Sequence, residues 1–90
     1  MSNKRDLKRT IHCICGDLFA ETIAVSLYNN EVNPENVEAL LTSIVRLNSN
    51  YINRISHVQP GMKPRLYFQE LKNSFSKEAN EIVDQICNLG

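Results

Sequence analysis

The sequence has no tryptophan, only three cysteines, three glycines and three prolines, and no excess of charge of either sign. Three cysteines do not form the even-numbered disulfide framework of a small secreted domain, so reduced thiols in the cytoplasm are the expected state. The ten basic and ten acidic residues cancel, which argues against a protein whose overall charge attracts nucleic acid.

The chain is also short for an enzyme. Its 90 residues bury about 60–65% of their unfolded surface, which is enough for one core but too little for a large catalytic cleft with its supporting shell. A hydrophobic content of 42% with balanced charge excludes a disordered chain. We therefore expect a single domain over residues 1–90 and no classical two-domain enzyme.

An uninterrupted apolar run is missing as well. The longest mainly apolar segment, residues 11–28, contains His12, Asp17 and Glu21, whereas a membrane-spanning helix needs about 20 continuous apolar residues. No small-residue cleavage site follows an apolar core, so the pattern of a signal peptide is not met. The expectation is a cytoplasmic protein that does not cross a membrane.

The chain instead carries helical periodicity, which turn residues interrupt at two places. Asn33 followed by Pro34 is a typical helix start. The segment 59–64, with Gly61 between two prolines, ends one helix and opens the next. These signals predict helices at about residues 3–29, 34–58 and 64–88. Because connections of about five residues make sequential helices antiparallel, the predicted fold is all-α, an up-down-up three-helix bundle.

The apolar faces of the three helices differ in width when each is projected at about 100° per residue. The third helix has one apolar face, which includes Val83, and the second has a wide arc that requires more than one neighbour. The first helix has two stripes. Its core stripe comprises Leu7, Ile11, Ile14, Leu18 and Val25.

The second stripe of the first helix is the candidate functional surface. It comprises Gly16, Phe19, Ala20, Ile23, Ala24 and Leu27. A glycine inside a helix costs about 1 kcal/mol relative to alanine, and an exposed apolar stripe usually marks an interface. The stripe predicts a homodimer through the first helix, or a docking face for another protein. The alternative is that the alanines are only good helix formers and that Gly16 is a tolerated defect.

Asn48 falls inside the apolar arc of the second helix. A polar side chain there needs a hydrogen-bond partner, because leaving it unpaired costs about 1–3 kcal/mol. It either lies at the core edge and bonds to backbone or water, or it sets register and oligomeric state as a single asparagine does in coiled coils.

The predicted topology separates the charges along the bundle. The basic end collects Lys4, Arg5, Lys8, Arg9, Arg54, Lys63 and Arg65. The opposite end collects Glu31, Glu35, Glu38, Glu78, Glu81 and Asp84. This pattern indicates antiparallel self-association, or a solvated charged surface with no partner. A further alternative is that cations of the basic end bind phosphate or nucleic acid. The candidate anion-binding residues are Lys4, Arg5, Lys8, Arg9, Lys63 and Arg65. This alternative is weaker, because no aromatic residue lies among the cations and no helix-turn-helix pattern is present.

Metal chemistry is not expected. His12, Cys13 and Cys15 are adjacent, but Cys13 and Cys15 project about 200° apart on a helix and do not share a tetrahedral ion. Cys87 lies near the far end of the third helix and does not complete the set. Cys15 borders the core stripe and is expected to be buried, whereas Cys13 and Cys87 are expected at the periphery.

Catalytic chemistry is not expected either. The acidic residues Glu78, Glu81 and Asp84 drift round the exposed side of the third helix and are read as a solvated face. No histidine lies near a serine or cysteine in a setting that fixes a nucleophile and base, and the glycines form no phosphate loop. The tyrosines are expected at the core edge with their hydroxyls in water: Tyr28, Tyr51 and Tyr67. The sequence thus predicts a non-catalytic interaction protein without a cofactor.

Overall fold

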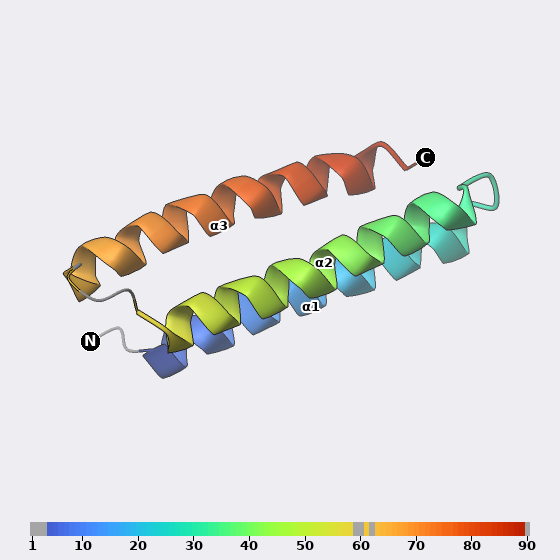
Figure 1. The fold of residues 1–90 in the computed structure, drawn as a ribbon. Coiled ribbons are helices and arrows are strands. Elements are labelled where there is room, and N and C mark those ends of the chain that lie inside the picture. The colour runs from blue at the N-terminus through green and yellow to red at the C-terminus, as the bar shows by residue number, and fades with distance from the viewer. Residues whose placement is uncertain (1–3, 59–60, 62, 90) are drawn as a thin grey trace.

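The computed structural model describes residues 4–58, 61 and 63–89. This part of the chain contains three helices, α1 (Lys4–Tyr28), α2 (Pro34–Ser56) and α3 (Pro64–Cys87), and no strand (Figure 1). Their ends lie within two residues of the predicted ones, and the predicted start at residue 3 falls outside the described residues. The all-α assignment is confirmed.

Short polar segments set the helix ends as the sequence indicated. Asn33 is the N-cap of α2, and its side chain accepts a hydrogen bond of 2.9 Å from the backbone N–H of Glu35. Pro34 occupies the first turn, where its missing N–H is not needed. Gly61, between α2 and α3, has a φ of 86°, a left-handed conformation that glycine adopts without strain.

The three helices run up, down and up, which confirms the predicted bundle (Figure 1). The molecule is rod-shaped, with extents of 49 × 19 × 16 Å. Most of the helix packing joins α1 to α2, and α3 lies across one side of that pair. It is also displaced along the rod toward the N-terminus of α1, so that the loop between α1 and α2 projects beyond its end (Figure 1).

The core lies along the line where the three helices meet. Its largest fully buried side chains include Ile11, Ile44, Ile55 and Leu71. The core stripe predicted for α1 is largely confirmed, but Ile14 is at its edge and 36% exposed. Thr22 of α1 is also buried, which apolar periodicity does not indicate because threonine is polar. Its hydroxyl donates a hydrogen bond of 2.8 Å to the Leu18 carbonyl, which satisfies the buried polar group within the helix.

Tyr51 corrects the expectation that its hydroxyl lies in water. Only 2% of the residue is exposed, and the hydroxyl donates to the Glu78 carboxylate and lies 2.9 Å from Ser74 Oγ. Its ring packs edge-on against Phe75, with centroids 5.2 Å apart, and the Arg54 guanidinium lies 4.8 Å from the ring centre. Glu78 is exposed as predicted, and its carboxylate in addition pairs α3 with α2.

The other two tyrosines behave differently from each other. Tyr28 is 89% exposed at the end of α1. Tyr67 is half-buried against the core, and its hydroxyl donates a hydrogen bond of 2.9 Å to the Arg54 carbonyl near the end of α2. Tyr67 therefore lies at the core edge as predicted, and at this exposed position its hydroxyl also satisfies a carbonyl in the last turn of α2.

Candidate association surface

A groove between α1 and α2 runs along the side of the molecule that faces away from α3. It has a volume of about 290 Å³, and none of the described residues of α3 lines it. The lining residues are His12, Cys15, Gly16, Phe19, Ile44, Val45 and Asn48. Since α3 packs on the other side of the pair, this groove is an uncovered seam between the two most closely packed helices.

Apolar side chains on both helices surround this groove. Val45 is 53% exposed and Ile23 is 38% exposed, while Phe19, Leu41 and Ile52 are half-buried. We call this surface the open face. It comprises His12, Gly16, Phe19 and Ile23 of α1 with Leu41, Val45, Asn48 and Ile52 of α2.

The structure places Gly16, Phe19 and Ile23 of the stripe predicted on α1 in the open face, and the other three residues of the stripe beyond its edge. Gly16 and Ala20 are exposed, and Ala24 is half-buried. Leu27 is 74% exposed, near the end of α1 that extends past α3. Phe19 packs against the core with part of its ring. The stripe is therefore largely accessible, with Phe19 joining it to the interior.

The half of the open face on α2 was not assigned from the sequence. Its signal was the wide apolar arc of the second helix, which indicated a second neighbour. Leu41, Val45 and Ile52 are the part of that arc that α1 and α3 leave accessible. A projection of one helix does not show which side of its arc remains uncovered.

Asn48 finds its hydrogen-bond partner across the groove. His12 Nδ1 on α1 lies 2.9 Å from Asn48 Oδ1 on α2. Asn48 is half-buried at the edge of the core, and its partner is a side chain instead of the expected backbone or water. The two polar groups thus satisfy each other in the middle of an otherwise apolar surface.

Gly16 exposes its backbone beside the His12–Asn48 pair, because glycine has no side chain. A Cβ built at its position meets no atom within 4 Å outside the helix's own neighbouring backbone. The described part of the chain therefore has no packing need for a glycine here, although glycine destabilises a helix interior.

The cysteines divide as the sequence predicted. Cys15 is buried, whereas Cys13 and Cys87 are exposed. Burial raises the pKa of the Cys15 thiol above its ordinary value, since the interior disfavours the thiolate. Among residues 4–58, 61 and 63–89, no three His, Cys, Asp or Glu side chains are grouped so that they could hold a metal ion.

We expect iodoacetamide to alkylate Cys13 and Cys87 at least about tenfold faster than Cys15 in the native protein, because only the thiolate reacts and Cys15 is both covered and disfavoured as a thiolate. Peptide mass spectrometry after timed labelling measures the three rates. In denaturant the rates should converge. Native labelling of Cys15 at the rate of Cys13 would contradict its burial.

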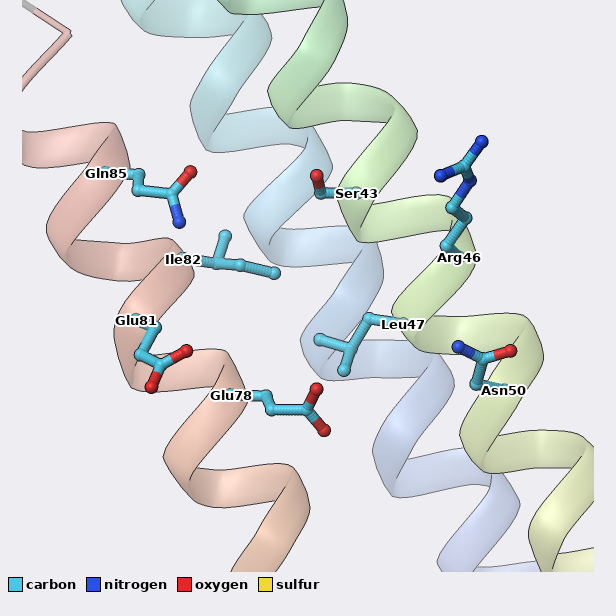
Figure 2. Close-up of a pocket in the computed structure, with 8 residues that line it drawn as sticks. All are labelled: Ser43, Arg46, Leu47, Asn50, Glu78, Glu81, Ile82 and Gln85. Atoms are coloured by element: carbon cyan, nitrogen blue, oxygen red, sulfur yellow. The ribbon is translucent and has the colours of Figure 1, made fainter.

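A second groove, of about 240 Å³, lies between α2 and α3 and is more polar (Figure 2). Figure 2 shows the Glu78 carboxylate turned toward α2, while Arg46 points away from α3. Glu78 and Glu81 share this groove with Leu47 from the middle of α2. These carboxylates therefore do not lie at the acidic end of the rod as predicted, because α3 is displaced along it.

The charged groups at the two ends otherwise follow the topology. The start of α1, the end of α2 and the start of α3 lie at one end (Figure 1). The candidate anion-binding cations there are half-buried Lys8 and the exposed Lys4, Arg5, Arg9, Lys63 and Arg65. Glu31, Glu35 and Glu38 are exposed at the other end. The α1–α2 pair is thus basic at one end and acidic at the other.

By length and average composition, α1 would be able to cross a membrane, unlike the other helices in the described part of the chain. This differs from the sequence expectation because an average tolerates Asp17 and Glu21, which interrupt the apolar run. The core helix of a bundle meets the same criterion. In this structure α1 supplies core residues, including Ile11 and Leu18.

Comparison of the chain with protein-family models, with curated proteins and with solved structures gives no match.

Proposed function

We propose that this chain is a non-catalytic protein that acts by association, and that it binds a second copy of itself through the open face. The observation that carries the proposal is the row of accessible apolar side chains on the side away from α3, above all Val45, Ile23 and Phe19. Contiguous apolar surface of this kind marks sites of association in soluble proteins.

A second copy would cover the side of the α1–α2 pair that α3 leaves exposed. Within one copy, α3 covers only one side of the α1–α2 pair. Covering the other side removes more apolar area from water, which stabilises the assembly by about 25 cal/mol per Å² before the entropy of association is subtracted. A twofold-symmetric pair needs only one self-complementary surface, which makes it the simplest oligomer for a single chain.

The contribution of α1 to the core favours this role for its apolar surface over insertion into a bilayer. Five α1 residues are buried against the other two helices: Leu7, Ile11, Cys15, Leu18 and Thr22. Extracting α1 would expose the opposing side chains, among them Ile44 and Leu71, which are 1% or less exposed. The open face offers an association surface that leaves this core intact.

Replacing Ile23 with Glu is expected to raise the dissociation constant of the dimer by at least about tenfold, because each copy then places an unpaired charge in the interface. Sedimentation velocity over a concentration series measures the change. The matched control is Val83→Glu, since Val83 on α3 is 41% exposed, close to the 38% of Ile23, but lies outside the open face.

The control should associate like the wild type, and circular dichroism should show that both variants keep their helices. A wild-type chain that sediments as a monomer at every concentration would refute self-association. A dimer that Val83→Glu weakens and Ile23→Glu leaves intact would place the interface on α3.

A further inference from the structure

The polar pair His12–Asn48 lies at the centre of the open face, with apolar residues on both sides along the rod. Toward one end lies Ile52 of α2, and toward the other lie Val45, Phe19 and Ile23. An isolated polar pair within an apolar contact surface fixes how two copies align, because any other alignment leaves its unused groups without partners.

Charges of opposite sign lie near the two ends of the same face. Arg5 is seven positions before His12, so it projects from the same side of α1, and Glu38 is seven before Val45 on α2. Because α1 and α2 are antiparallel with His12 opposite Asn48, Glu38 is level with Thr22 of α1. Arg5 and Glu38 are therefore about 25 Å apart along the rod, at 1.5 Å per residue.

The midpoint between these two charges lies between His12 and Gly16 along α1. A twofold axis through that point, lying in the plane between the two open faces and perpendicular to the rod, brings Arg5 of each copy to the level of Glu38 of the other. The same axis sets the His12–Asn48 pair of one copy near Gly16 and Val45 of the other. One alignment thus brings end charges of opposite sign to the same level, centres the polar pair and uses the exposed backbone at Gly16.

We infer that the open face binds a second copy of this chain in antiparallel orientation about this axis, and that the two copies associate only while His12 is uncharged. The inference rests on the proposed self-association and specifies its geometry and its chemical control. The His12–Asn48 pair thus fixes the alignment of the two copies and makes their association depend on pH.

The need for a neutral imidazole follows from the surroundings of His12. With Asn48 Oδ1 as acceptor, Nδ1 carries the hydrogen and Nε2 is left as an acceptor. The charged side chains nearest along α1 are Lys8 and Arg9, which are cations, and the α2 side presents uncharged groups. No described residue of α3 lines the groove.

The second copy adds Gly16 and Val45 to these surroundings and no anion. An imidazolium enclosed there would be a desolvated charge next to other cations, which opposes association. In a separate copy His12 is exposed and its charge is hydrated. Protonation therefore favours the dissociated chains.

Sedimentation velocity at about pH 7.5 and about pH 5.5, which bracket the range where histidine changes charge, tests the inference. The wild-type dissociation constant is expected to rise at least about tenfold at the lower pH, with helical circular dichroism unchanged. The chain has only two histidines, so His57→Gln is a matched control and should keep this dependence. His12→Gln and His12→Leu, two neutral replacements of different shape, should remove it.

The outcomes separate the inference from the proposed function. A wild-type dimer that is equally stable at both pH values refutes the role of His12 and leaves self-association standing. Loss of the pH dependence in His57→Gln, or its persistence in both His12 variants, also refutes it. A wild type that is monomeric at both pH values refutes self-association itself and the inference with it.

Discussion

Replacing Tyr51 with alanine is expected to lower the free energy of unfolding by about 3–5 kcal/mol, as for other large buried aromatics. Tyr51 is 2% exposed and packs edge-on against Phe75, with ring centroids 5.2 Å apart. The substitution leaves a cavity between α2 and α3 and removes the hydroxyl that bonds to Glu78. Chemical denaturation followed by circular dichroism measures the loss.

Tyr51→Phe separates the ring from the hydroxyl. We expect it to lower the free energy of unfolding by about 1–2 kcal/mol, since it keeps the packing and removes the bonds to Glu78 and Ser74. Tyr28→Phe is the matched control, because Tyr28 is 89% exposed and its change should be close to zero. Equal effects of the two substitutions would contradict the buried hydrogen-bond network.

The difference in stability between wild type and Tyr51→Phe is expected to change at alkaline pH. Burial, followed by the hydrogen bond to Glu78, raises the pKa of Tyr51 above its ordinary value of 10.0. The folded state thus holds the proton more tightly than the unfolded state, and this stabilisation is fully present below about pH 10. It is lost as the pH rises from there through the raised pKa. The stability gap between wild type and Tyr51→Phe should therefore shrink above pH 10.

Local patterns were enough to predict the three helices and their order. The Asn33-Pro34 start and the turn around Gly61 act within a few residues, and apolar periodicity identified most of the core. The environment of Tyr51 was not predictable in this way. A projection gives the direction of a side chain but not the depth to which a neighbouring helix covers it, and tyrosines commonly lie at a core edge with the hydroxyl in water. The contact of Glu78 with Tyr51 was not predictable for the same reason.

The candidate surface was predicted only in part, and the missing part depends on helix packing. The apolar stripe on α1 was visible because it exceeded what two intramolecular neighbours require. The bond between His12 and Asn48 joins residues 36 positions apart, and no projection of a single helix contains it. The displacement of α3 along the rod likewise depends on side chains that meet only in the folded bundle (Figure 1).

Gly16 is expected to show opposite effects on the protomer and on the dimer. Gly16→Ala should raise the free energy of unfolding of the separate chain by about 0.5–1 kcal/mol, because alanine favours the helix and its Cβ meets no atom within 4 Å. In the proposed dimer the same Cβ would lie near the twofold axis, so it should weaken association. Denaturation at low concentration and sedimentation at high concentration measure the two effects separately.

Gly16→Leu should enlarge the effect on association, with the dissociation constant rising by about a hundredfold or more. Each copy adds a large side chain near the twofold axis, and overpacking costs about 1–3 kcal/mol per site. Asn80→Leu is the control, since Asn80 is exposed on α3 and outside the open face. If Gly16→Leu assembles as well as Asn80→Leu, the glycine is a tolerated helix defect and the copies do not meet at this position. If it instead dissociates while its helices remain intact, the glycine is retained for the contact between chains at the expense of protomer stability.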